Sequence, residues 1–506
     1  MCRYLLLPLL FLALLLSSAC GGPTEPDLII PPEMQVREAQ GRRASIDLAA
    51  VDWQAGPPLA GAAAPEAIFA ESEVIELELS GPFAALNSAH DKELWKKAKL
   101  TLPEGAQGEA QELEVKIRQR GNIRFEICSF PGLTVKLPKR GAEASFGDMK
   151  TFKIVTHCDK NVRESVGIVA RIIGDESSVF REAWVYRAWN LVSGGGHATR
   201  RARITYTDSE TAKVMVKKAI LLETHGWVAK RHEAKEGKAK SEAWIPRNRL
   251  SDLDPRSAAL THLFQIFVGN DDWILYDLND PAPWRMRGSR LDEDIANIDI
   301  SIYKLENMMV LEREGEWHLA EPFDWDLASM AAGYTPLRTG LRLNKDLFAD
   351  RPEEFRRLLW LLQVKFRTRH SRPAINYAVS MFEQMRPDLE ASIDAAGMDS
   401  EGEEQVRRRM QWFYEQIADD ALFRATAAVE DAKLYADPAM AEVHCPVVHP
   451  GILMDIEEQR GDMVKIRILD DWPGVCRSST NKRVWKWGWM KAMQVSRDWP
   501  PAASGE

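Results

Sequence analysis

Several familiar signals are absent from this chain of 506 residues. It has no Gly-x-x-x-x-Gly-Lys-Ser/Thr loop, which excludes a Walker-type nucleotide site. It has no excess of basic residues: 66 Lys and Arg against 75 Asp and Glu give a net charge of -9, which argues against a nucleic-acid partner. With 45% hydrophobic residues it also lacks the composition of a disordered chain. Its length instead indicates two or three packed units.

The apolar run at the start of the chain, Leu5 to Leu16, is too short to span a bilayer as a mature helix. Arg3 precedes this run, and small residues lead from it into Cys20, as in a secretory signal. A cysteine at this point followed by two glycines resembles a bacterial lipobox. We expect a signal peptide over residues 1–20, acylation of Cys20, and an exported protein held by lipid on a membrane of the bacterial cell envelope. Plain secretion and an uncleaved anchor are the alternatives.

Cysteine is scarce, and the four in the exported part of the chain are Cys128, Cys158, Cys445 and Cys476. An even number in an oxidising compartment predicts disulfides. Sequence proximity favours Cys128 with Cys158 and Cys445 with Cys476, each closing a loop of about thirty residues worth about 3 kcal/mol. Zinc is the rival interpretation, but the chain has no Cys-x-x-Cys pair.

The hydrophobic pattern divides the rest of the chain into segments. Residues 21–70 are rich in Pro, Ala and Gly and suit a flexible tether. Apolar residues alternate with polar ones within residues 71–225, which predicts an antiparallel sheet with one buried face. Residues 226–436 show mostly helical periodicity. The pattern predicts an α+β protein in which a small sheet lobe precedes a larger helical lobe.

Residues 437–498 differ again. Gly461-Asp462, Val464, Trp472 and Gly488-Trp489 follow the order of a bacterial Src-homology-three-like barrel: a Gly-Asp turn, a Val-rich strand, a tryptophan and a closing Gly-Trp. The resemblance implies a small C-terminal β-barrel, and such barrels in exported proteins often bind cell-wall peptides or proteins. A structural appendage with tryptophans in its core explains the pattern equally well.

Two acidic clusters lie about fifty residues apart, Gly-Asn-Asp-Asp-Trp at 269–273 and Pro-Phe-Asp-Trp-Asp at 322–326. An acid that accepts a proton, followed by acids that hold a divalent cation, is a frequent arrangement in metal-assisted phosphoryl transfer. Both clusters also have a simpler explanation. Asp272 suits a helix cap or a turn, and Asp324 and Asp326 suit the half-exposed end of a strand.

Five motifs in series resemble the spore-coat CotH kinase family, over about residues 75 to 335. They are Arg-Gly-Asn at 120–122, Phe-Lys-Ile-Val-Thr-His-Cys at 152–158, Phe-Arg-Glu-Ala at 180–183, and the two acidic clusters. The resemblance implies a two-lobed protein-kinase-like fold. It also implies transfer of phosphate from ATP, with magnesium or manganese, to a hydroxyl group of a protein or a small molecule.

The resemblance assigns roles to acidic and amide side chains. Asp272 matches the catalytic acid that accepts the proton of the acceptor hydroxyl. Asn307 and Asp324 match metal ligands, with Asp326 nearby. Magnesium needs few protein oxygens because it keeps waters and substrate phosphates, so one Asn and one or two Asp suffice.

A lysine on the sheet lobe is expected to contact the nucleotide phosphates and to pair with Glu182, as kinases pair a strand Lys with a helix Glu. Lys136 and Lys153 both fit by strand position. Lys153 is preferred because its strand directly precedes the segment leading into the helix of Glu182.

One residue departs from the family pattern. Glu306 stands where the family often has His, and the extra carboxylate either tightens cation binding or marks a site that has drifted toward binding without catalysis. The alternative function is therefore a non-catalytic surface or coat-type binding protein on a kinase-like scaffold. A nucleotide-sugar glycosyltransferase, with Asp324 and Asp326 as its Asp-x-Asp, would need a βαβ half upstream, which the antiparallel strand pattern does not suit.

Overall fold

The computed structural model of the protein describes a large part of the chain from residue 51 onward. The predicted features at Cys20, Asp272, Asp326 and Cys476 lie outside the described residues. No helix in the described part is both long and apolar enough to cross a membrane. The described residues are 51–70, 73–103, 110–121, 124–125, 128–158, 176–237, 245–246, 253–270, 274–275, 302–303, 305–313, 318–325, 328–332, 366, 372–418, 425–427, 432–440, 443–448, 453–468 and 487–496.

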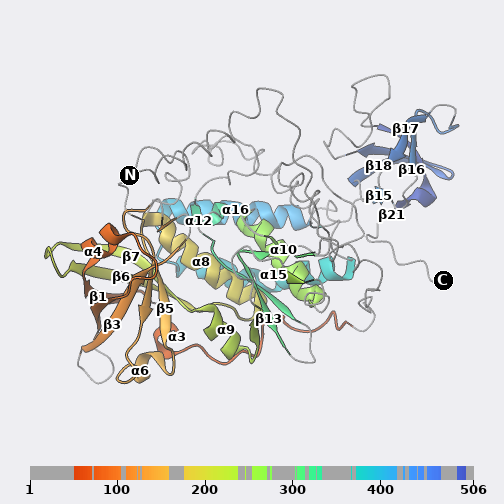
Figure 1. Ribbon diagram of the computed structural model, residues 1–506. Coiled ribbons are helices and arrows are strands. Elements are labelled where there is room, and N and C mark those ends of the chain that lie inside the picture. Colours follow the sequence, from red (N-terminus) through yellow and green to blue (C-terminus); the bar gives the residue numbers. More distant parts are fainter. Residues whose placement is uncertain are drawn as a thin grey trace, which may run out of the picture. The chain divides into compact units, whose positions relative to one another are not determined.

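A closed barrel of seven strands forms the sheet-rich part of the protein (Figure 1). Neighbouring strands run antiparallel except at one seam, where β1 and β6 are parallel. An odd number of strands cannot alternate in direction all the way around a ring, so one parallel pair is required. In order around the barrel the strands are β1 (Ile75–Gly81), β2 (Lys96–Leu102), β3 (Gln111–Gln119), β4 (Leu133–Lys136), β5 (Thr151–Val155), β7 (Val214–Leu222) and β6 (Thr199–Asp208).

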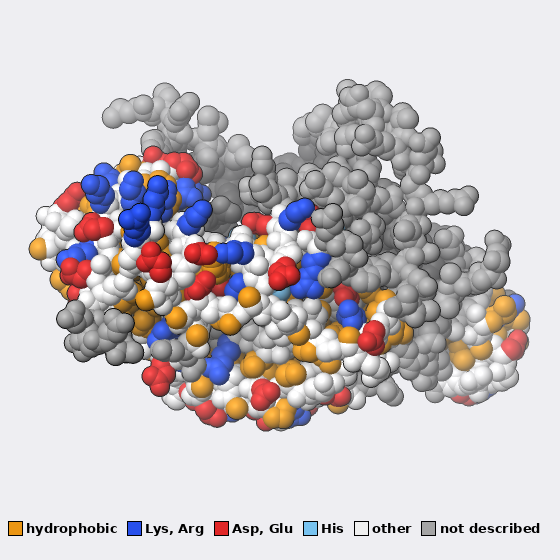
Figure 2. Space-filling model, turned by 90° about the horizontal axis from the view of Figure 1, so that it is seen from below, with side chains coloured by type: hydrophobic (Ala, Val, Ile, Leu, Met, Phe, Trp, Pro, Cys, Tyr) orange, Lys and Arg blue, Asp and Glu red, His pale blue; other side chains and the backbone are white. Residues whose placement is uncertain are grey.

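The two faces of the barrel wall differ, as the alternating pattern predicts. Leu113, Val115 and Ile117 of β3 are buried in the interior, which aromatic side chains such as Phe152 also fill. The outward side chains of these strands are mostly polar, and some form ion pairs. For example, Nζ of Lys99 on the neighbouring strand lies 2.7 Å from Oε2 of Glu112 on β3. Lys and Arg side chains gather on one part of the barrel surface (Figure 2). Short helices α3 (Ala67–Ala70), α4 (Phe83–Ala89) and α6 (Glu143–Phe146) accompany the barrel.

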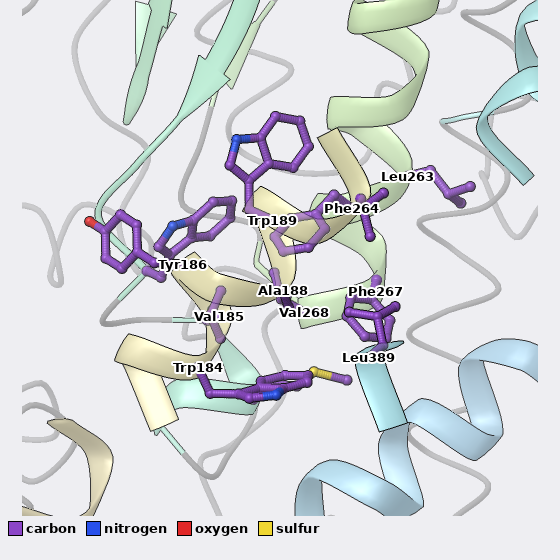
Figure 3. Packing of buried hydrophobic residues seen from close by; sticks show 14 of the residues in the cluster. Trp184, Val185, Tyr186, Ala188, Trp189, Leu263, Phe264, Phe267, Val268 and Leu389 are labelled. Atoms are coloured by element: carbon purple, nitrogen blue, oxygen red, sulfur yellow. The ribbon is translucent and has the colours of Figure 1, made fainter. Parts of the chain in front are cut away.

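The second core surrounds α8 (Glu176–Ser193), whose side chains are buried on nearly every side, as in helices that lie inside a protein. Trp184 of α8 lies 6.1 Å from Phe267 of α10 (Pro255–Val268), measured between ring centroids (Figure 3). Asp254 caps the start of α10 through the N–H groups of Arg256 and Ser257. The other helices are α9 (His225–Arg231), α12 (Ser329–Ala332), α15 (Arg372–Asp394) and α16 (Ser400–Ala418).

Small sheets lie among these helices. β13 (Met308–Glu312) pairs antiparallel with β14 (Leu319–Pro322) and with β8 (Lys235–Gly237). Two-stranded pairs are formed by β10 (Ile274–Leu275) with β12 (Leu305–Glu306), and by β9 (Ile245–Pro246) with β11 (Ile302–Tyr303). The predicted α+β class is confirmed by this combination of barrel, helices and small sheets.

Residues 425–496 contribute an antiparallel seven-stranded sheet. Gly461 takes a left-handed backbone conformation (φ 59°) in the turn between β18 and β19, and Gly488-Trp489 lies on β20. A Cβ at Gly488 would collide with Leu434. In order across the sheet the strands are β17 (Val443–Val448), β16 (Ala432–Tyr435), β20 (Trp487–Lys491), β19 (Met463–Ile468), β18 (Leu453–Arg460), β15 (Ala425–Ala427) and β21 (Val495–Ser496), with the 3-10 helix η7 (Ala492–Gln494) before β21.

The structure tests two predictions made from the sequence, the Cys128–Cys158 disulfide and the extent of the tether. The Cys128–Cys158 disulfide is confirmed, and it joins the segment after β3 to the end of β5 with its Cα atoms 4.8 Å apart. The tether extends less far than predicted, because part of residues 21–70 packs into the fold. Leu59 is fully buried in the core around α8, and its N–H donates to the carbonyl of Ser193. Ile68 and Phe69, near the end of the same segment, are buried in the core of the barrel.

Candidate functional site

The predicted metal ligands Asn307 and Asp324 emerge from the same end of the β13–β14 hairpin. Met308, the first residue of β13, is paired with Pro322, the last residue of β14. The N–H of Phe323 then donates to the carbonyl of Asn307 at 3.0 Å. One residue directly precedes one strand and the other closely follows its antiparallel partner, so the hairpin holds their backbones close together.

Both ligand candidates have an uncommon backbone conformation. The φ angles are 52° at Asn307 and 61° at Asp324, in the left-handed region that costs most L-residues free energy. Asn and Asp tolerate this region best. Strained backbones concentrate at functional sites, so two such residues at one hairpin end mark it as a candidate site.

The first acidic cluster is only partly described, because residues 271–273, including Asp272, lie outside the described residues. Its flanks are placed. Asn270 is buried and donates from Nδ2 to the Oε1 atom of Gln265 at 3.0 Å. On the other side, Ile274 is paired with Glu306, the residue before Asn307. The cluster therefore leads into a strand that runs beside the Asn307 segment.

The structure brings Lys153, rather than Lys136, together with Asp324. Lys136 is exposed on the outside of the barrel, with its Nζ atom 6.0 Å from the ring centroid of Trp95. Lys153 is partly buried on β5. Burial and the positive charge of Arg120 lower the pKa of Lys153 to about 7, against the opposing effect of Asp324. A partly buried lysine whose pKa lies this close to physiological pH is a candidate functional group.

Glu182 lies on α8, as predicted, and its hydrogen bond differs from the expected pairing with a strand lysine. It accepts from Nη2 of Arg124 at 3.1 Å. One turn further along the helix, the hydroxyl of Tyr186 accepts the backbone N–H of Asp324 at 3.1 Å. Burial and then the charges of Glu182 and Asp324 raise the pKa of Tyr186 well above its usual value. Helix α8 thus bonds directly to the segment that carries the candidate metal ligand.

A line of hydrogen-bonded polar side chains behind Lys153 was not predicted from the sequence. The Nζ atom of Lys153 is 2.9 Å from Nε2 of His225, whose Nδ1 is 3.1 Å from Nε2 of His197. The Nδ1 atom of His197 is in turn 2.7 Å from Oε1 of Glu321. Glu321 also accepts from Nε1 of Trp189 at 2.7 Å. One feature of the sequence could have indicated this line: Glu321 stands on the otherwise apolar β14, and a carboxyl group on a buried strand requires hydrogen-bond partners.

Burial sets the protonation of this line of side chains. His197 and Glu321 are fully buried. Burial, followed by the positive charge of Lys153, lowers the pKa of both His197 and His225 well below the usual value. Burial raises the pKa of Glu321 to about 8, although Trp189 and the backbone N–H of His197 oppose the shift by donating to it. Both imidazoles are therefore neutral at physiological pH.

The loop that carries His197 is fixed from its other side. Arg231 donates to both carboxylate oxygens of Glu223, at 2.9 and 2.8 Å, and Glu223 accepts the N–H of Ala198 at 2.7 Å. Gly196 has a φ of 142°, and a Cβ there would come within 2.9 Å of Oε1 of Glu321. A glycine is required at this position because the carboxylate occupies the space of a side chain.

Among the residues that the structure describes, no three His, Cys, Asp or Glu side chains form a ready-made metal centre. Asn307 and Asp324 offer one amide and one carboxylate, a set that suits magnesium, which keeps several waters and substrate oxygens. Comparison with known proteins finds no matching family model, no matching curated protein and no matching solved structure.

Proposed function

We propose that this protein is an exported, membrane-anchored kinase-like phosphotransferase that moves phosphate from a nucleotide with magnesium to a hydroxyl group of a protein or small molecule. The observation that carries the proposal is the shared hairpin end of Asn307 and Asp324, with Lys153 close enough for its pKa to respond to Asp324. Protein kinases hold their metal ions with an Asn and an Asp and contact the phosphates with a strand Lys. The three residue types occur here in one region.

The residue after Asp324 supports this proposal. Trp325 is fully buried, and its ring centroid lies 6.2 Å from Tyr186 on α8 and 5.2 Å from Phe264 on α10. In protein kinases an apolar side chain follows the metal-binding Asp, and its packing sets the active or inactive position of that Asp. Trp325 provides such an anchor. In this proposal the barrel is the nucleotide lobe and the helices around α8 form the catalytic lobe.

A specific observation favours the alternative, a non-catalytic binding protein on the same scaffold. Active kinases pair the strand Lys with the helix Glu, whereas here Glu182 bonds to Arg124 and Lys153 bonds to His225. In either case we propose that the Src-homology-three-like module predicted over residues 437–498, whose sheet also includes β15 and β16, binds an envelope peptide or protein. A nucleotide-sugar glycosyltransferase is not supported, because the strands before α8 form an antiparallel barrel wall and not the βαβ half that such an enzyme needs.

Nucleotide-dependent thermal stabilisation of the full-length protein in detergent tests the proposal. A ligand at 100 times its Kd stabilises the folded state by about 2.7 kcal/mol, so Mg-ATP is expected to raise the Tm of the wild type. Asp324→Ala removes the effect, while Asp388→Ala, at an exposed position on α15, retains it. Absence of a shift in the wild type with every divalent cation contradicts nucleotide binding. Incorporation of labelled phosphate from ATP then separates the enzyme from the non-catalytic binder.

A further inference from the structure

The line of hydrogen-bonded side chains from Lys153 to Glu321 includes more residues than are needed to hold a phosphate-binding lysine. Its four side chains come from β5, the start of α9, the loop before β6, and β14, so four separate segments of the chain converge on one line of hydrogen bonds. Phe323 packs against both imidazoles, with ring centroids 4.4 Å from His225 and 6.1 Å from His197. The line is therefore enclosed by apolar surface along its middle.

Two complete arrangements of protons satisfy all three contacts. In the first, Lys153 is an ammonium that donates to Nε2 of His225, both imidazoles carry their proton on Nδ1, and His197 donates to the carboxylate of Glu321. In the second, Glu321 is a carboxylic acid that donates to Nδ1 of His197, both imidazoles carry their proton on Nε2, and His225 donates to the neutral amine of Lys153. Both arrangements keep the imidazoles neutral and have the same net charge.

We propose that Glu321 is an internal proton donor for Lys153, acting through His197 and His225 when a phosphate group arrives beside the lysine. The O–H bond of Glu321 breaks as an N–H bond forms at Nδ1 of His197. His197 releases its Nε2 proton to Nδ1 of His225, and His225 releases its Nε2 proton to the lone pair of Lys153. One proton leaves the carboxyl group, one is gained by the amine, and each imidazole gives and takes one.

The charges around the two ends favour the second arrangement when no anion is present. Burial and the positive charge of Arg120 both disfavour an ammonium at Lys153. The carboxylates of Asp324 and Glu236 favour the ammonium, but their effect is smaller than that of burial. Burial disfavours both the carboxylate of Glu321, whose side chain is fully buried, and the ammonium of Lys153, so the shared proton belongs on the carboxyl group. A phosphate next to the lysine reverses this preference, because an anion favours the ammonium.

The charged groups near Glu321 do not prevent the transfer of the proton from Glu321 to Lys153. The positive charge of Arg231 acts on both His197 and Glu321, lowering the pKa of each. Arg231 is itself bound in a two-point ion pair with Glu223, so that carboxylate is already occupied. Arg120 also acts on His225 and keeps it neutral. With the proton on Glu321, Lys153 is a neutral amine and the desolvation of a partly buried ammonium is avoided.

This inference rests on the proposed function in one respect, that the arriving anion is a nucleotide phosphate. Calorimetry at pH 7.5 in buffers of different ionisation enthalpy measures the protons taken up when Mg-ATP binds to the full-length protein. The wild type is expected to take up close to none, since the lysine is charged from within. Glu321→Gln has no such donor and takes up most of one proton from the buffer.

A second variant separates proton transfer from simple positioning. His225→Gln keeps an acceptor for Lys153 where Nε2 stood but cannot pass a proton to His197. We expect it to bind Mg-ATP and to take up protons as Glu321→Gln does. A proton count equal to that of the wild type would show that the histidines only position the lysine, and it would overturn the proposal.

A measurement without nucleotide keeps the proposal testable if Mg-ATP does not bind. Carbon and nitrogen NMR of the imidazoles reports their tautomers, with His197 and His225 assigned by the signals that change in His225→Gln. The proposal predicts two neutral Nε2–H imidazoles in the free protein at pH 7. An imidazolium, or opposite tautomers on the two rings, breaks the line of donors and refutes it. This result is independent of nucleotide binding, so it distinguishes failure of the relay from failure of the proposed function.

Discussion

The hydroxyl of Tyr186 accepts the backbone N–H of Asp324 at 3.1 Å, which ties the central helix α8 to the residue proposed to bind the metal. Asp324 has a left-handed backbone (φ 61°), a conformation that persists only where surrounding contacts hold it. Burial of Tyr186 and of the adjacent Trp325 keeps water from competing for this bond.

Tyr186→Phe tests the importance of this bond. The variant loses the acceptor for the Asp324 N–H, and we expect the free energy of unfolding to fall by about 1 kcal/mol. The affinity for magnesium in the presence of ATP is expected to fall as well, because Asp324 is less well held. Tyr377→Phe is the matched control, since it removes a hydroxyl that donates to the carbonyl of Gly56 at 2.8 Å. Equal loss of metal affinity in the two variants, by titration calorimetry, would contradict the role of Tyr186.

Asn307→Gly separates the ligand from its strained backbone. Glycine adopts a φ of 52° without steric cost, so the free energy of unfolding is expected to change by less than about 1 kcal/mol. The amide oxygen is lost, and magnesium-dependent nucleotide binding is expected to weaken at least tenfold. Ala212→Gly, at another left-handed position (φ 58°), provides the control with intact binding. Full binding by Asn307→Gly, in the same thermal-shift titration, would remove Asn307 from the site.

The pH dependence of stability tests the neutral state of Lys153. Its pKa is about 7 in the folded protein against 10.5 as a free side chain, so between these values the unfolded chain binds more protons. Stability from this group therefore rises with pH between pH 8 and 10, by at most about 1.4 kcal/mol per pH unit. Lys153→Met is expected to flatten this rise in denaturant unfolding, while Lys136→Met, at an exposed position, leaves it unchanged. Equal slopes in wild type and Lys153→Met would show that the lysine is not buried as described.

The disulfide supports both stability and the site. Replacing Cys128 and Cys158 by Ser opens a loop whose ends are 30 residues apart, and we expect the free energy of unfolding to fall by about 3 kcal/mol. Arg124, which bonds Glu182, lies close to Cys128 in the sequence, so its hold on α8 is expected to loosen too. Adding a reductant to the wild type should remove most of the stability difference in denaturant unfolding. A difference that survives reduction would mean that the serines act by some other route.

Local patterns in the sequence predict the parts of this fold that depend on local chemistry. The alternation of Leu113, Val115 and Ile117 predicts a strand with one buried face, and that face lines the barrel. The spacing of Cys128 and Cys158 predicts their pairing, because a short loop favours it. Asn307 and Asp324 were predicted as metal ligands from the family resemblance, and the hairpin explains why their backbones lie close together.

Features that depend on distant segments could not be predicted in this way. No short pattern shows that His225, His197 and Glu321 lie in one line, since each belongs to a different segment and only the tertiary structure aligns them. The partner of Lys153 was predicted as Glu182 for the same reason. The order of strand and helix along the chain favours Lys153 over Lys136, but it does not show which side chain lies beside that lysine. The burial of Leu59 could not be predicted either, because the segment around it has little hydrophobic periodicity.

The parallel seam between β1 and β6 also has a consequence for how the chain acquires its structure. Ile75 is paired with Ala202 and Gly81 with Asp208, while β2 to β5 and the whole of α8 lie between them in the sequence. The barrel cannot close until β7, which lies between β5 and β6 and ends at Leu222, has also been synthesised, so no shorter nascent chain contains the complete barrel. Pairings between such distant segments form slowly. The barrel and α8 are therefore assembled together in one late step, after most of residues 75–222 have been made.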